Sequence, residues 1–137
     1  MKILSLSLLL TFVLTFSVLS SITAQTKDSA KMELNEMVHD FGTIHQNDAC
    51  TYNLKVTNIG NIPLIILNAS TTCGCDMATW PREPILPGKS AFVKYIYDSN
   101  RIGHFEKTMS ITSNATIPSI IVKFKGIVLR ASEKAEE

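Results

Sequence analysis

The sequence has almost no excess of charge of either sign, since its 137 residues include 13 basic and 12 acidic side chains. A chain this close to neutral has no long-range field that would gather nucleic acid or an anionic membrane. No stretch with helical spacing of apolar residues reaches ten residues, and the chain has no internal repeat. We therefore expect no nucleic-acid partner, and we see no room for the crossover helices that a parallel sheet requires.

The sequence also lacks the local signatures of common enzyme classes. Its six glycines form neither a phosphate-cradling loop nor a dinucleotide fingerprint, and its acidic residues are scattered without a carboxylate pair. Asp40-Phe41-Gly42 spells the metal-binding triplet of kinases, but the other kinase motifs do not accompany it. We expect this triplet to be structural, with Phe41 in the core and Gly42 at a bend. The sequence predicts a protein that is not an enzyme and needs no cofactor.

The chain begins with MKILSLSLLLTFVLTFSVLSSITAQ, which has the pattern of a secretory signal peptide. Lys2 supplies positive charge, an apolar stretch follows, and small residues offer a cleavage site after Ala24. The alternative is an uncleaved membrane anchor, because residues 3–22 are about long enough to span a bilayer. The seven Ser and Thr residues in that stretch favour cleavage. The sequence thus predicts an exported protein, periplasmic or secreted, that touches the membrane only if this segment stays uncleaved.

The predicted signal peptide comprises residues 1–24. The chain that follows it has room for one domain. Residues 25–31 are polar and form a predicted tether, and residues 130–137 form a charged tail. Between them, residues 32–129 consist of short segments that are rich in β-branched and aromatic residues and are separated by turn residues. This pattern is typical of a β-sheet domain.

The clearest predicted strand is Cys50–Asn58, in which apolar and polar residues alternate with a period of two. Pro63–Ala69 is continuously apolar at its centre, so we expect it to be buried on both faces. The other predicted strands are Ser90–Asp98, Phe105–Ser113 and Pro118–Leu129, with a weaker one at Met32–Val38. Six or seven short strands with regular turn signals predict an all-β fold, an antiparallel β-sandwich of about seven strands.

Four segments together resemble one protein family. They are HDFGTI, VTNIGNIPLIILNAS, TTCGCDMATWPREPILPGKSAFV and GHFEKTMSITSN. The family consists of exported bacterial envelope proteins of unknown function that carry an immunoglobulin-like domain, and the resemblance covers about residues 33–128. The domain is similar to major-sperm-protein-like and pilus-chaperone-like sandwiches. The resemblance therefore implies an immunoglobulin-like fold and a Cys-Gly-Cys motif, but it implies no activity, and Cys50 is not part of the family's pattern.

The three cysteines are disulfide candidates, because thiols outside the cytosol tend to oxidise. The start of strand Cys50–Asn58 and the end of the next strand should lie at the same end of a sandwich, which would place Cys50 near Cys73 and Cys75. One possibility is a disulfide between Cys50 and either of the other two. A second is a bridge between Cys73 and Cys75 with a turn at Gly74, which would be strained and reducible.

Two further interpretations of the cysteines remain open. Cys73 and Cys75 could bind a soft metal ion, Cu or Zn, with Cys50 or His45 as additional ligands. All three cysteines could instead be free, buried or intermolecular, with no special chemistry. A reducible bridge between Cys73 and Cys75 would support thiol–disulfide oxidoreductase activity, although the helix that usually stabilises such thiolates is missing from the pattern.

The segment after the motif, WPREPILPG, has three prolines and should be extended and semi-rigid. One interpretation is a crossover that packs over the end of the sandwich through Trp80, Ile85 and Leu86. The other is an exposed surface for a partner, made of Trp80, Pro81, Arg82 and Pro84. We expect a solvated rim at Asp76, Arg82 and Glu83.

These observations favour an exported, non-enzymatic binding or structural module of the bacterial cell envelope. Its partner would be a protein or another envelope component, which could add a strand to an open sheet edge. The alternative is a thiol-redox or soft-metal-binding protein that uses the Cys-Gly-Cys motif.

Overall fold

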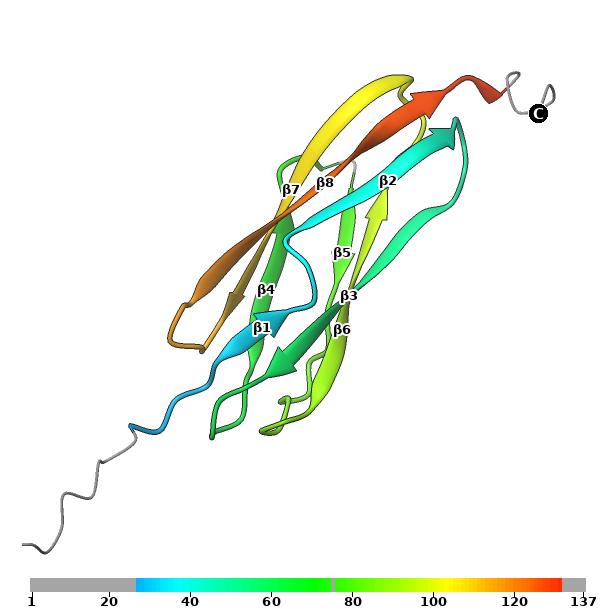
Figure 1. Ribbon diagram of the computed structural model, residues 1–137. Coiled ribbons are helices and arrows are strands. Elements are labelled where there is room, and N and C mark those ends of the chain that lie inside the picture. The colour runs from blue at the N-terminus through cyan, green and yellow to red at the C-terminus, as the bar shows by residue number, and fades with distance from the viewer. Residues whose placement is uncertain (1–26, 75, 132–137) are drawn as a thin grey trace, which may run out of the picture.

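The computed structural model describes residues 27–74 and 76–131, which form two β-sheets packed against each other (Figure 1). Sheet A has the order β1 (Met32–Leu34), β3 (Cys50–Asn58), β6 (Ser90–Tyr97) and β5 (Met77–Thr79). Sheet B has the order β2 (Val38–His45), β8 (Ser119–Leu129), β7 (Gly103–Ser113) and β4 (Ile66–Thr71). The predicted β-sandwich is confirmed, with eight strands in the described residues. The predicted signal peptide and most of the charged tail lie outside them, and none of the described residues forms a helix that could span a bilayer.

The predicted strand Cys50–Asn58 has the same bounds as β3, and its inward residues Leu54 and Val56 are fully buried. The strand predicted at Pro63–Ala69 differs from expectation, since Ile65 is 38% exposed and Leu67 is 57% exposed. The reason is that the fold has only two layers, so each sheet packs against the other through one face and the outer face of this strand meets solvent. The three-residue strand β5 was not predicted, because a segment so short shows no periodicity.

The fold departs from a purely antiparallel sandwich in one pair of strands. β2 and β8 run parallel, with Val38 opposite Lys123 and His45 opposite Leu129. We expected no parallel pairing because the chain has no crossover helix. Here the first and last strands of sheet B are joined by the rest of the domain, so their parallel alignment needs no local crossover.

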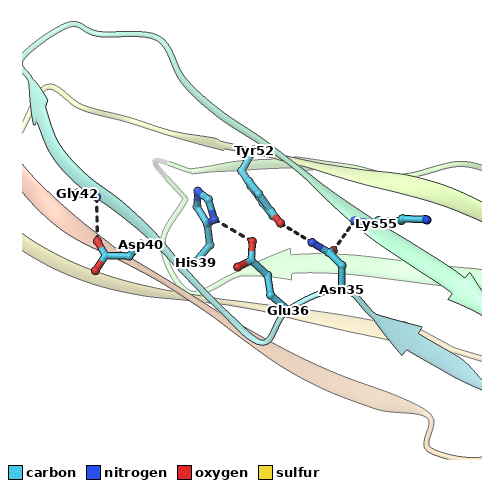
Figure 2. A network of polar contacts seen from close by, with 7 residues as sticks. All are labelled: Asn35, Glu36, His39, Asp40, Gly42, Tyr52 and Lys55. Carbon is cyan, nitrogen blue, oxygen red and sulfur yellow. Dashed lines mark hydrogen bonds and ion pairs between the residues drawn. The ribbon is translucent and has the colours of Figure 1, made fainter.

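The Asp40-Phe41-Gly42 triplet forms a bulge in β2, where the pairing with β8 shifts register. Gly42 has a φ of +65°, which a residue with a side chain rarely adopts, and its N–H donates to Asp40 Oδ1 at 2.8 Å (Figure 2). Phe41 packs against the buried core. The expectation of a structural role, with Phe41 inward and Gly42 at a bend, is confirmed.

Aromatic side chains join the two sheets at the centre of the core. The rings of Tyr95 on β6 and Phe124 on β8 are stacked, with centroids 3.8 Å apart and planes inclined by 5°. Tyr97 and Phe105 form a second stack of this kind, also at 3.8 Å. Tyr95 and Phe124 are fully buried, so this contact combines a large buried apolar area with ring stacking.

A polar cluster holds the segment where the chain crosses from β1 in sheet A to β2 in sheet B (Figure 2). Asn35 donates from Nδ2 to the Tyr52 hydroxyl oxygen at 2.8 Å and accepts the Lys55 N–H at 2.8 Å. The His39 ring stacks on Tyr52 at 3.8 Å, and its Nδ1 lies 2.9 Å from Glu36 Oε1. The crossing is therefore fixed by side chains that come from both sheets.

Asn58 organises the opposite end of the domain from Cys73. Its side-chain amide donates to the carbonyl oxygens of Ile62, at 2.8 Å, and Ile85, at 2.9 Å, and its Oδ1 accepts the Gly60 N–H at 2.9 Å. Asn58 is fully buried, and these bonds satisfy its amide group. We call this end, made of residues 27–31, 59–61, 86–89 and 114–118, the N-terminal pole.

Gly60 lets the polar segment before β1 pass directly over the turn that follows β3. A Cβ atom at Gly60 would stand 2.6 Å from the Lys31 backbone nitrogen and even closer to the Ser29 carbonyl oxygen. Ala30 between them is only 1% exposed. The last residues of the predicted tether are thus packed against the domain, and only a glycine leaves space for them.

We predict that Gly60→Ala lowers the free energy of unfolding by about 1–3 kcal/mol, because the new methyl group displaces packed backbone. Chemical denaturation would measure this loss, and trypsin should cleave faster after Lys27 and Lys31. Gly74→Ala is the matched control, because a Cβ atom there meets nothing within 4 Å. Equal stability of the two variants would contradict the prediction.

Candidate functional site

The loop that carries Cys73 passes from the end of β4 in sheet B to the start of β5 in sheet A. The Thr71 hydroxyl donates to the carbonyl oxygens of Cys73, at 2.8 Å, and Asp76, at 3.2 Å. The Asp76 N–H donates to the Cys73 carbonyl oxygen at 3.3 Å. These bonds hold the backbone of Cys73 close to that of Asp76. We call this region, with the nearby Cys50, the cysteine end.

Asp76 is buried, with only 6% of its surface exposed. Its Oδ2 accepts the Tyr95 hydroxyl at 2.8 Å, and its Oδ1 lies 3.4 Å from the Asp98 N–H. The expectation that Asp76 belongs to a solvated rim is wrong, because the residue faces inward just before β5 and meets Tyr95 there. Arg82 and Glu83 are exposed as expected. A buried carboxylate depends on such hydrogen bonds, so the cysteine end is built around this contact.

The Tyr95 hydroxyl acts as a fixed donor in this contact. Burial raises the pKa of Tyr95 far above its ordinary value, and the hydrogen bond to Asp76 and the charge of that carboxylate raise it further. The hydroxyl therefore stays protonated near neutral pH and can donate its hydrogen bond to Asp76. Its role at the cysteine end is to hold Asp76 in place.

Cys50 lies at the cysteine end, as predicted from the order of the strands. It stands opposite Tyr97, while the neighbouring Ile96 stands opposite Met77 at the start of β5. The predicted disulfide from Cys50 to Cys73 or Cys75 is wrong for this structure, since Cys50 is a free thiol. The physical reason is that β6 lies between β3 and β5. Strands two positions apart are separated by about 9–10 Å, which exceeds the Cα separation of a disulfide.

The Cys50 thiol is buried and shielded from solvent. It is 5% exposed, and its Sγ donates to the Asp48 carbonyl oxygen at 3.5 Å. Burial raises the pKa of Cys50, and the negative charge of Asp48 adds to this effect. Since the thiolate is the form that attacks disulfides and binds soft metals, Cys50 is poorly suited to both tasks.

His45 is the last residue of β2 and contacts Asp48. Its N–H donates to Asp48 Oδ2 at 2.9 Å, and its Nδ1 lies 3.7 Å from that oxygen. No three His, Cys, Asp or Glu side chains converge as a metal site within residues 27–74 and 76–131. Cys75 lies outside these ranges, so the metal site of Cys73, Cys75, Cys50 and His45 stays a prediction.

The segment after β5 packs against the domain through Trp80 and Ile85. Trp80 contacts the core, and the Arg82 guanidinium carbon lies 4.4 Å from the centroid of its ring. Ile85 is buried and bridges to Leu64, whereas Leu86 is 57% exposed. The crossover interpretation is thus right for Trp80 and Ile85 and wrong for Leu86. A partner surface at Trp80, Pro81, Arg82 and Pro84 stays a prediction, although Arg82 already occupies a face of the indole ring.

The residue pair that the sequence analysis missed is Asp76 with Tyr95. In the strand predicted at Ser90–Asp98, Tyr95 shares one face with Val93 and Tyr97, the apolar face that should point inward. A buried tyrosine hydroxyl needs an acceptor, which was the available signal for a nearby buried polar group. The sequence offered no way to choose Asp76 among the acidic residues, because the contact joins residues 19 positions apart.

We predict that Tyr95→Phe lowers the free energy of unfolding by about 1–3 kcal/mol, because it leaves the buried Asp76 carboxylate without its shortest hydrogen bond. Urea denaturation would measure the change. Tyr97→Phe is the matched control, since it removes a hydroxyl from the next inward position and keeps the ring stack on Phe105. If both variants lost the same stability, the hydrogen bond to Asp76 would not be the cause.

Comparison with solved structures supports the fold. A protein of unknown function from Porphyromonas gingivalis W83 is 20% identical, with a TM-score of 0.65 over 77% of this chain and 51% of that one, so the chain spans about half of its length. PapD-like domain 7 of human CEP192 is 11% identical, with a TM-score of 0.63 over 82% of this chain and 96% of that one. The YadV chaperone is 14% identical, with a TM-score of 0.52 over 74% of this chain and 52% of that one.

These neighbours confirm the immunoglobulin-like, PapD-like character of the sandwich. A search of curated proteins finds no match to the sequence. One family model matches residues 32–128, which is nearly the whole of the domain, and its members are described as proteins of unknown function. The chain therefore belongs to the DUF1573 family.

Proposed function

We propose that the protein is an exported, non-enzymatic immunoglobulin-like module of the bacterial cell envelope that binds a partner there. The N-terminal pattern of Lys2, an apolar stretch and small residues before Gln25 supports export. The fold that the chain shares with the YadV chaperone supports a role in binding another protein. This likeness is one of fold, so the binding role needs support from the surface of the chain itself.

The observation that carries the binding role is the free edge of sheet B at β4. One side of β4 pairs with β7, and in the described part of the chain no strand of sheet B lies on its other side. Leu67 on β4 is 57% exposed, and Ile65 just before β4 is 38% exposed. The free part of the edge begins after Leu64, which is already paired with Ile85. An extended peptide can join such an edge through main-chain hydrogen bonds while its side chains contact the exposed apolar residues.

We predict that a photo-crosslinking amino acid at position 67 captures a defined partner in living cells, whereas the same amino acid at position 92 does not. Phe92 is a matched control because it is 59% exposed but belongs to β6, which has strands on both sides. Crosslinked bands in the envelope fraction would be separated by electrophoresis, and mass spectrometry would show whether the protein begins at Gln25. Equal crosslinking at both positions would contradict binding at β4, and a cytosolic protein that retains residues 1–24 would contradict export.

One observation favours the alternative function, thiol redox or binding of Cu or Zn by the Cys-Gly-Cys motif. The 3.3 Å hydrogen bond from the Asp76 N–H to the Cys73 carbonyl oxygen has the spacing of a tight turn. Residues two apart in a turn lie closer together than in a strand, where their separation is nearly 7 Å. Because Cys50 is a free thiol, a bridge within one chain would join Cys73 to Cys75.

Alkylation would test this alternative. We expect protein denatured without reductant to take up one iodoacetamide label per chain, on Cys50, and reduced protein to take up three. The folded protein should react slowly at Cys50, because burial and Asp48 raise its pKa. Cys50→Ala is the control and should remove the single label. Three labels without reductant would contradict the bridge, and Cu or Zn retained in native mass spectra would then favour a metal site.

A further inference from the structure

Three exposed aliphatic side chains stand at the N-terminal pole, each on a different turn. Ile59 is 55% exposed, Leu86 is 57% exposed and Ile117 is 65% exposed. Figure 1 shows the three turns that carry them at the lower end of the view, the end at which the N-terminal segment leaves the domain. Single exposed aliphatic residues are common on protein surfaces, but a group of them on neighbouring turns can mark a binding surface.

Hydrogen bonds show that these turns are neighbours. The Ile59 N–H donates to the Lys31 carbonyl oxygen at 3.0 Å, and the Thr116 N–H donates to the Ala30 carbonyl oxygen at 3.0 Å. The third turn joins them through the Gly88 N–H, which donates to the Asn58 carbonyl oxygen at 2.8 Å. The aliphatic residues are therefore held on one rigid surface.

Three exposed lysines lie at this surface. Lys27 and Lys31 are on the segment that enters the domain, and Lys89 is on the 86–89 turn. The acidic residue Asp28 already accepts the Asn61 side-chain amide at 2.7 Å. Because the whole chain is nearly neutral, these lysines act only at contact distance, where salt does not yet screen them.

The chain that precedes the pole indicates what this surface faces. Residues 3–22 are mostly apolar, and only a few residues separate Ile22 from Lys27. A linker of five residues reaches at most about 17 Å. If residues 3–22 stay in the bilayer as an uncleaved anchor, the N-terminal pole must stand close to the surface of that bilayer.

We propose that the N-terminal pole docks on the surface of a lipid bilayer, with Ile59, Leu86 and Ile117 inserted among the headgroups and the lysines beside anionic lipids. This goes beyond the proposed function, which leaves the orientation of the module open. Three aliphatic residues with a few lysines make a weak, reversible contact that strengthens with anionic lipid. β4 runs from the pole toward the cysteine end, so its far part would remain free to bind a partner.

Co-sedimentation with vesicles tests the docking on purified protein that begins at Gln25, which contains the whole described core from Ala30 to Val128. Vesicles of phosphatidylethanolamine with 30% phosphatidylglycerol should bind the protein, and the triple variant Ile59→Ser, Leu86→Ser, Ile117→Ser should reduce the partition coefficient at least tenfold. The matched control is the triple variant Met77→Ser, Phe92→Ser, Ile121→Ser, whose native residues are 57–60% exposed but lie on the sheet faces. It should bind like the wild type.

A depth measurement gives a second readout that does not depend on the triple variant being folded. Brominated lipid should quench the fluorescence of Leu86→Trp but not that of Phe92→Trp, each compared with the native protein and its single Trp80. Absence of vesicle binding by the native protein would overturn the proposal, as would equal binding by the two triple variants. If the native protein bound no vesicles and the pole variant lost a protein partner that the native protein retains, the membrane-docking proposal would also be overturned. The pole would then be a protein interface.

Discussion

The stack of Tyr95 on Phe124 is the contact on which the arrangement of both sheets depends. β6 and β8 are inner strands of their sheets, so two rings 3.8 Å apart fix how the layers face each other. The hydroxyl of the same tyrosine binds Asp76 and thereby fixes where the chain returns from sheet B to sheet A. One side chain thus couples the apolar core to the cysteine end, and the position of Cys73 follows from the packing of the core.

The two ends of the sandwich are both stabilised by hydrogen bonds of a buried polar side chain, but their surfaces differ. At each end a buried polar side chain, Asp76 or Asn58, accepts or donates hydrogen bonds that tie neighbouring segments together. At the cysteine end the Asp76 bonds tie the Cys73 loop to β6. At the N-terminal pole the Asn58 bonds tie the turn after β3 to the segment at Ile85, and the Thr116 N–H bonded to the Ala30 carbonyl oxygen adds the 114–118 turn. The buried side chains of Asp76 and Asn58 therefore help to fix the loops at the two ends of the domain.

The local part of this structure could be predicted and the non-local part could not. The bounds of β3 and the inward direction of Tyr95 follow from a period of two, which is a property of neighbouring residues. The parallel pairing of β2 with β8 joins the two ends of the domain, and β5 is too short to show a period. Cys50 illustrates the limit best: its end of the domain was predicted correctly, but the insertion of β6 between β3 and β5 excluded the predicted disulfide.

The sandwich leaves few places where a partner could bind. Its interior is filled by stacked rings and aliphatic residues, and ion pairs such as Lys125 with Asp40 and Lys123 with Glu106, both at 3.2 Å, occupy the outer face of sheet B. The edge at β4 and the N-terminal pole are two of them. β4 begins beside the pole, where Ile65 is hydrogen-bonded to Asn114, and ends at Thr71 next to the cysteine end. A module that rests on a membrane at its pole would hold the far end of β4 away from that membrane, so both contacts could be made at once. This division would give a role to two groups of exposed apolar side chains, those beside β4 and those at the N-terminal pole.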